Sequence, residues 1–381
     1  MLSELTIGRG AQANAIDSYG KLGHPGYKWV GWFGVIVAFI ITSYYCHVGG
    51  WVLRYVASYA TEATKVYADP LGYFYALLGY NAVTGETWFP LTAVIFAGIF
   101  MGITCFIIVK GVESGIERFN KIGMPALFCL LVFIIAYIAC QPGAAEGYKF
   151  MFSPDFSVFS DPNVGFGRVL KNAAGQMFFS LSIGLGVMIT YGSYLGKQEH
   201  LQRNAFIVCG ADTLIALMAG MAVMPACAAF GVEYGAGPGL LFASMQTVFS
   251  HMGSVGNLIG FLFYLLVLIA ALTSSISMLE LCTAYAVDKQ IDKGLTPKRA
   301  KHTSEVAALV FIAGSLVALD GLGAGVAGGA AVETPATLLG LSVRGWNDCW
   351  LDLYDMVAEG ILMPLGALVM TILIGLSLIH I

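Results

Sequence analysis

A run near residues 172–195 places glycines and hydroxyl groups in the middle of an apolar stretch. Ser180 and Ser182 are followed by Gly184 and Gly186. Glycine weakens a helix, and hydroxyl groups can satisfy backbone groups that a break leaves free. Such a break can present carbonyl oxygens to a cation and amide groups to a carboxylate, as at transporter sites near the membrane midplane. Close packing of small residues between helices explains the pattern equally well.

A second apolar run, near 254–288, carries four hydroxyl groups within five residues. Thr273, Ser274, Ser275 and Ser277 form this cluster. Hydroxyl and carbonyl oxygens are hard ligands that suit small, hard cations. For any single residue, back-bonding to the preceding turn is the commoner role, but the clustering favours a site. Glu280, in the same run, indicates function if it lies inside the membrane, or a solvated acid at the cytoplasmic end.

Two other apolar runs contain polar side chains that could face a cavity. Asp212 precedes a long apolar stretch, so its carboxylate needs a partner cation, a raised pKa or a water-filled vestibule. Tyr44 and Tyr45 lie too deep for an interfacial aromatic belt and could line a cavity. His47 has no partner ligand nearby in the sequence, which favours a hydrogen-bonded bundle residue over a metal ligand.

The elements that must position these residues are membrane helices. Of 381 residues, 58% are hydrophobic and only 11% are charged, which indicates an integral membrane protein. Lysines and arginines are concentrated in alternate loops, so the loops near 110–121, 197–203 and 289–301 should face the cytoplasm. Eight membrane segments are predicted, near 29–57, 91–110, 122–141, 172–195, 204–231, 254–288, 304–320 and 355–377.

Several other functions are disfavoured. The eight cysteines show no CxxC or Cys/His spacing, so buried, inert thiols are expected. Gly323, Gly325 and Gly328 have GxGxxG spacing, but they follow a membrane helix instead of a strand, which favours an external loop over a nucleotide site. No nucleophile–base pair suggests an enzyme, and no basic patch with interleaved aromatics suggests a nucleic-acid partner.

Specific stretches resemble the neurotransmitter:sodium symporter family, in its bacterial amino-acid-transporting branch. They are GQMFFSLSIGLG at 175–186, ITYGSY at 189–194, LTSSI at 272–276, GIERFNKIGMP at 115–125 and ELTIGR at 4–9. The resemblance implies an all-α, polytopic membrane bundle of the inverted-repeat transporter fold. The eight segments would correspond to the family's third to tenth helices, with residues 1–381 forming a single transmembrane domain.

The resemblance also predicts that the first helix and most of the second are absent. The first helix supplies sodium and substrate ligands in the family, so the chain as given is expected not to transport. The residues from Ser377 to Ile381 do not resemble the family.

The resemblance further implies roles for individual residues. Sodium would be bound at two sites, the first with Ser180 and Asp212 and the second with Ala270, Thr273 and Ser274. Tyr45 would bind the substrate carboxylate, and Asp212 would supply fixed charge in place of chloride. The substrate site would comprise Ile41, Tyr45, Phe179, Ser180, Ser182, Leu185, Ser274 and Met278. The gates would comprise Phe179 and Asp355 on the outside and Tyr194 and Asp288 on the inside.

These roles predict a sodium-coupled symporter that imports a neutral, hydrophobic amino acid by alternating access. Sodium ions would be transported with the substrate, and the protein would be a multi-pass protein of the inner (plasma) membrane, embedded in its lipid bilayer. The alternative is a sensor or regulatory membrane protein that has the same pocket but does not transport.

Overall fold

The computed structural model describes nine stretches of the chain. They are 1–111, 116–161, 165–196, 198–234, 237–324, 326–327, 330–331, 333–341 and 348–377. Gly115 of the 115–125 motif, Gly325 and Gly328 of the glycine-rich loop, and the final residues 378–381 lie outside these stretches.

Seven helical spans in the described part are long and apolar enough to cross a membrane. They match seven of the eight predicted segments. The spans contain α3 (Lys28–Thr61), α6 (Leu91–Val109), α7 (Arg118–Ala139), α11 (Leu201–Ala229), α14 (Ser254–Asp292), α15 (Arg299–Asp320) and the continuous run of α17 (Trp350–Val357), η5 (Ala358–Leu362) and α18 (Met363–Ser377).

The remaining predicted segment, 172–195, forms two shorter helices instead of one span. They are α9 (Gly165–Ser180) and α10 (Val187–Ser193). An all-helical, polytopic membrane bundle is therefore confirmed. The described part also contains one minimal hairpin, in which β1 (Val326–Ala327) pairs antiparallel with β2 (Ala330–Ala331).

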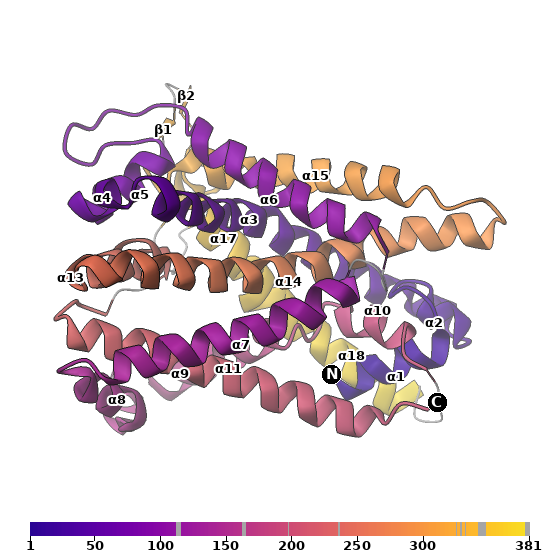
Figure 1. The fold of residues 1–381 in the computed structure, drawn as a ribbon. Helices are drawn as coiled ribbons and strands as arrows, with labels where there is room; N and C mark the ends of the chain where they lie inside the picture. The colour runs from indigo at the N-terminus through magenta and orange to yellow at the C-terminus, as the bar shows by residue number, and fades with distance from the viewer. Residues whose placement is uncertain are drawn as a thin grey trace.

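Short elements cover the two ends of the bundle (Figure 1). The end that carries the predicted cytoplasmic loops, here named the inner end, holds α1 (Leu2–Ala11), α2 (Ser18–Lys21), η1 (Pro25–Tyr27) and α10. The opposite, outer end holds α4 (Ala63–Ala68), α5 (Pro70–Leu78), α8 (Ala144–Phe152) and α13 (Met245–His251). The other short elements are η3 (Phe156–Phe159), α12 (Gly237–Gly239), η4 (Leu240–Ser244) and α16 (Pro335–Leu339).

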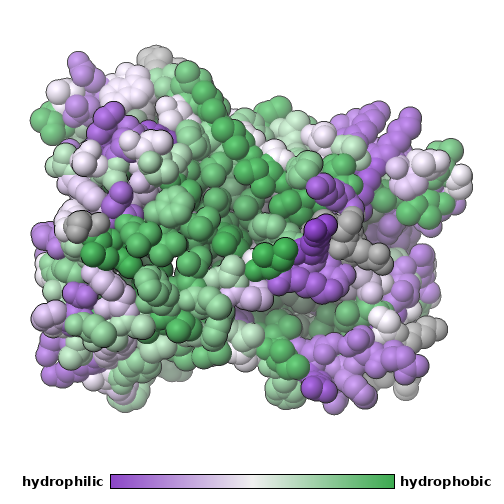
Figure 2. All heavy atoms as spheres, in the orientation of Figure 1, coloured by the Kyte–Doolittle hydropathy of each residue, from purple (hydrophilic) through white to green (hydrophobic). Residues whose placement is uncertain are grey.

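The long helix α3 lies against α6, α14 and α15. Glycines allow these close approaches: a Cβ on Gly50 would lie 2.4 Å from the backbone of Ala97 in α6, and one on Gly314 in α15 would lie 1.8 Å from a carbonyl of α3. Helices in a bilayer associate through such small-residue contacts. Figure 2 shows the outcome: a hydrophobic band crosses the middle of the molecule, and hydrophilic residues gather at both ends.

Candidate functional site

The site is built around the interruption between α9 and α10. Gly184 and Gly186 have φ values of +91° and +82°, in the left-handed region that glycine adopts without strain. A Cβ on Gly184 would also lie 2.5 Å from the carbonyl oxygen of Met363 in α18. Conformation and space therefore both require glycine at position 184, and the predicted break in this segment is confirmed.

Glu4 of α1 holds the broken segment in place. Its side chain is buried, and its Oε1 accepts a hydrogen bond from the backbone N–H of Gly184 at 2.9 Å. A break leaves backbone donors that need partners inside a membrane, and this carboxylate is one such partner. Glu4 belongs to the ELTIGR motif at 4–9, which resembles the family. No role could be predicted for it from the sequence, because its partner lies 180 residues away.

A cavity of about 480 Å³ opens beside the break, and helices α3, α7, α9, α11 and α14 contribute to its wall. All eight predicted substrate-site residues line it. So do all five residues predicted to bind sodium. The combined set, drawn from four separate predicted segments, is Ile41, Tyr45, Phe179, Ser180, Ser182, Leu185, Asp212, Ala270, Thr273, Ser274 and Met278.

Polar groups in this cavity form short local contacts. Ser180 Oγ lies 2.8 and 2.9 Å from the two carboxylate oxygens of Asp212, to which it can donate. Thr273 Oγ1 donates to the Ala270 carbonyl at 2.8 Å. The Ser180–Asp212 pair gathers oxygen atoms of the type that binds sodium, whereas the Thr273 contact is back-bonding to the preceding turn of its own helix.

The predicted hydroxyl cluster of α14 divides between two faces. Ser274 is exposed to the cavity, and Ser277 lies in its wall with its Oγ 2.6 Å from the hydroxyl of Tyr191. Ser275 instead is buried, 3.3 Å from Thr104 Oγ1 of α6. Only part of the cluster therefore belongs to the site, because successive helix positions face different directions.

Part of the cavity wall was missed in the sequence analysis. Helix α7 contributes Asn120, Met124 and Leu127, and α9 contributes Gln176. The α7 residues recur at i, i+4 and i+7, the spacing of one helix face. That periodicity was available in the sequence, but it does not say which neighbour the face contacts.

The predicted gate residues divide between the cavity wall and the ends of the bundle. Phe179 lines the cavity. Asp355 accepts a hydrogen bond from the Tyr44 hydroxyl at 3.0 Å, in a second cavity of about 520 Å³ that Glu359 and Lys171 also line.

Towards the inner end, Tyr194 donates to Glu280 Oε1 at 2.8 Å. Glu280 is buried and forms an ion pair with Arg299 of α15. The alternative of a solvated Glu280 is therefore wrong: its charge is balanced within the bundle.

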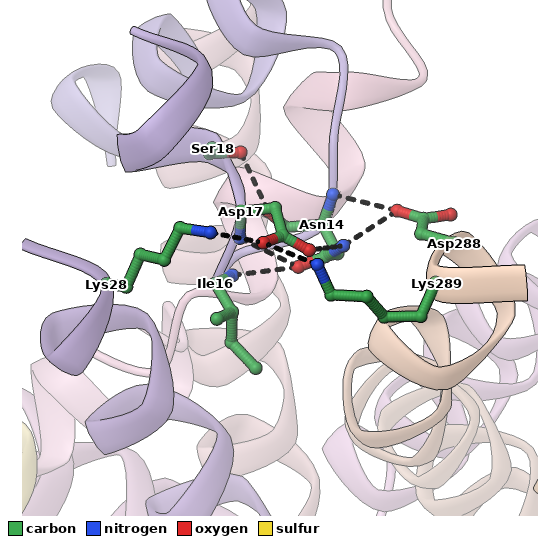
Figure 3. A network of polar contacts seen from close by, with 7 residues as sticks. All are labelled: Asn14, Ile16, Asp17, Ser18, Lys28, Asp288 and Lys289. Atoms are coloured by element: carbon green, nitrogen blue, oxygen red, sulfur yellow. Dashed lines mark hydrogen bonds and ion pairs between the residues drawn. The ribbon is translucent and has the colours of Figure 1, made fainter. Parts of the chain in front are cut away.

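Asp288 belongs to a network that joins three elements at the inner end (Figure 3). Its Oδ2 accepts hydrogen bonds from the backbone N–H of Asn14, at 3.0 Å, and from Asn14 Nδ2, at 2.9 Å. Asp17 Oδ1 lies 2.9 Å from Lys28 Nζ and 3.2 Å from Lys289 Nζ. The network ties the α1–α2 connection to the start of α3 and the end of α14.

Among the described residues, His47 and the cysteines are the ones for which metal or thiol chemistry was considered. No group of three His, Cys, Asp or Glu side chains is positioned there to hold a metal ion. His47 is buried, with its Nε2 3.3 Å from the Phe311 carbonyl, consistent with a bundle residue. All eight cysteines are free, but Cys129 and Cys140 are exposed, so the expectation of burial is wrong for these two.

An interrupted helix beside a cavity within a bundle of membrane helices is typical of membrane transporters. The chain belongs to the sodium:neurotransmitter symporter family, whose family model matches residues 76–326. It is thus a transporter, not an enzyme, and sodium is the ion to which this family couples transport.

Two relatives with similar sequences come from bacteria. The uncharacterized sodium-dependent transporter YhdH of Bacillus subtilis is 32% identical over 99% of this chain and 76% of its own length. An uncharacterized sodium-dependent transporter of Haemophilus influenzae is 33% identical over 99% of this chain and 78% of its own. The crystal structure of MhsT in complex with L-phenylalanine matches with a TM-score of 0.80 and 33% identity, over 99% of this chain and 78% of that one.

Proposed function

We propose that the protein is a sodium-coupled symporter that imports a neutral, hydrophobic amino acid by alternating access. The observation that carries this proposal is the cavity beside the α9–α10 break, where the predicted substrate and sodium residues lie together. The complex of the similar protein MhsT with L-phenylalanine supports an amino-acid substrate of this type. The protein would act as one transmembrane domain in the plasma membrane, its segments corresponding to the family's third to tenth helices.

Hydroxyl and carboxylate groups of the cavity supply the proposed polar contacts. Tyr45 would donate to the substrate carboxylate. Ser180 and Asp212 would bind the first sodium ion, and Thr273 and Ser274, with the carbonyl of Ala270, would bind the second. Sodium would organise the broken helix before the substrate binds, and the gate residues would then close alternate ends.

The apolar wall sets the substrate class. Ile41, Phe179, Leu185 and Met278 line the cavity. Asp212 is the one acidic side chain among the described lining residues, and its carboxylate is already hydrogen-bonded by Ser180. A charged substrate side chain would lose its hydration without gaining a free counter-ion, which is unfavourable.

Competition binding tests the substrate class. Leucine and phenylalanine should displace a bound, labelled hydrophobic amino acid at concentrations at least about tenfold lower than lysine or glutamate, because burying an unpaired charge costs more than 1.4 kcal/mol. The measurement uses purified protein in sodium buffer, with choline replacing sodium as the control. Tight binding of glutamate or lysine would contradict the assigned apolar wall.

A flux assay separates transport from sensing. Protein that also carries the family's first helix, reconstituted in liposomes with an inward sodium gradient, should accumulate the amino acid that binds best, and dissipating the gradient should stop accumulation. Sodium-dependent binding without accumulation would instead identify a sensor that uses the same cavity.

A further inference from the structure

A groove of about 310 Å³ lies outside the proposed transport site, between the inner ends of α6 and α7 and the facing side of α14. Its wall is apolar along most of its length, with Phe106, Ile122, Ala126 and Ile269 among the lining side chains. Phe106 and Ile122 are 63% and 67% exposed, as expected of residues that face lipid. Helices α7 and α14 lie close together at Gly123, because a Cβ there would lie 3.2 Å from the Ile269 side chain.

Two positively charged side chains, Lys110 and Arg118, lie at the inner end of this groove. Lys110 follows the last residue of α6, and its Nζ lies 4.2 Å from the centre of the Phe106 ring. Arg118 is the first residue of α7 and also lines the groove. No acidic side chain is among the described lining residues, and the neighbouring Glu117 pairs with Lys121 at 2.6 Å.

We propose that this groove binds an anionic phospholipid. One acyl chain would lie along the apolar wall, and the phosphate would contact Lys110 and Arg118. Basic residues between helices at the cytoplasmic face bind anionic headgroups, and the apolar wall extends from them towards the membrane centre. Positions 118 and 126 of α7 are about 12 Å apart along the helix axis, a length that an acyl chain can follow. In Figure 2 hydrophilic residues border the hydrophobic band near the junction of α6 and α7.

Helix α7 separates this groove from the proposed transport cavity. Phe119 and Gly123 face the groove, whereas Asn120 and Met124 face the cavity. On α14, Ile269 lines the groove and the adjacent Ala270 lines the cavity. The groove and the proposed transport cavity therefore share a wall formed by α7 and by the Ile269–Ala270 step of α14.

Native mass spectrometry of the purified protein tests the binding itself. In a neutral detergent, phosphatidylglycerol should bind more tightly than phosphatidylcholine of the same acyl chains. Lys110→Gln and Arg118→Gln should each weaken phosphatidylglycerol binding about fivefold, and the double variant about thirtyfold. Lys293→Gln is the control: it removes one positive charge at the inner end, just beyond α14, but lies outside the groove, and it should bind lipid normally.

Two further arms test the groove and the source of the phosphate. Ala126→Phe fills the apolar wall without changing charge and should also weaken phosphatidylglycerol binding, while millimolar inorganic phosphate should not compete. The proposal is overturned if Lys293→Gln is as damaging as Arg118→Gln, if Ala126→Phe binds lipid normally, or if inorganic phosphate displaces the lipid. These outcomes do not depend on transport, so loss of amino-acid binding alone would count against the proposed function and leave the lipid site standing.

Discussion

At the scale of single residues, ten of the 20 described side chains that line the cavity are polar, and the proposed chemistry gives distinct parts to several of them. A sodium ion that leaves water must regain its oxygen ligands from the protein, since unpaired charge inside a membrane is very unfavourable. In the proposed sites, Thr273 and Ser274 would supply hydroxyl oxygens on α14, and Asp212 would supply a carboxylate on α11; all three line the cavity. Neighbouring hydroxyls that point elsewhere provide controls.

The double variant Thr273→Ala, Ser274→Ala should raise the sodium concentration needed for half-maximal substrate binding by more than tenfold. Each hydroxyl contact to a charged group contributes about 1.5–3 kcal/mol, so losing two of them outweighs small rearrangements. Ser275→Ala is the control, because this hydroxyl contacts Thr104 outside the cavity. A sodium titration followed by substrate binding measures the effect, and an unchanged midpoint would remove these two residues from the sodium site.

In protein that also carries the family's first helix, the Asp212→Asn variant should lose transport in chloride-free medium and recover part of it when chloride is added. Two sodium ions and a zwitterion bring net positive charge into a low-dielectric site, and Asp212 offers the one carboxylate among the described cavity residues. Glu233→Gln removes a charge beyond the outer end of α11 and should transport normally without chloride. Chloride dependence of the unmodified protein, or normal chloride-free transport by Asp212→Asn, would exclude this role.

Residues that share one helix could be predicted from their spacing, and residues of different segments only through the family resemblance. Contacts to which the resemblance gave no role could not be predicted. The spacing of Thr273, Ser274 and Ser277 marked one stretch of α14, although the pattern alone could not show that Ser275 faces α6. Glu4 and Gly184 lie 180 positions apart, so their contact depends on how whole helices pack. The same holds for Asn120 and Met124, whose helix face was visible but whose neighbour was not.

At the scale of elements, the interruption between α9 and α10 is the feature on which the site depends. Its glycines made it predictable, since Gly184 and Gly186 weaken a helix wherever they occur. The contacts around the break could not be predicted from the sequence. Glu4 accepts a hydrogen bond from the Gly184 N–H, and the backbone of α18 occupies the space that a side chain at position 184 would need.

Gly184→Ala should lower the thermal midpoint of the purified protein and weaken amino-acid binding by at least tenfold. The left-handed conformation costs an alanine about 1–2 kcal/mol, and the Cβ would meet the Met363 carbonyl. Gly196→Ala is the control, because a Cβ there has no neighbour within 4 Å and its φ is not positive. Intrinsic fluorescence during heating and a binding titration report the two effects; equal behaviour of the two variants would show that the break does not require glycine at position 184.

At the scale of the whole molecule, alternating access requires an inner end that can close and reopen. The network around Asp17 and Asn14 joins the α1–α2 connection to α3 and α14, which also lines the cavity (Figure 3). Burial raises the pKa of Asp17, but hydrogen bonds from Lys28, Asn14 and Lys289 together hold it below the ordinary value. A lowered pKa means that the stabilisation is present above the ordinary aspartate pKa and is lost only as the pH falls through the lower, folded value. The network therefore stays charged at neutral pH.

Asp17→Asn should weaken the contacts that this network makes between the α1–α2 connection, α3 and α14, without unfolding the protein. The amide keeps the size of the side chain but removes the charge that Lys28 and Lys289 share. Because both lysines are partly exposed, each pair contributes no more than about 1 kcal/mol, so their joint loss should increase local opening about five- to tenfold.

Hydrogen–deuterium exchange read by mass spectrometry should show faster exchange in α1, α2 and the end of α14, with the outer elements α5 and α13 unchanged. Asp292→Asn, an exposed acid at the same end of α14, should exchange like the unmodified protein. Equal exchange in the Asp17→Asn variant and the unmodified protein would show that this network does not hold the inner end closed, whereas faster exchange everywhere would identify a general loss of stability instead.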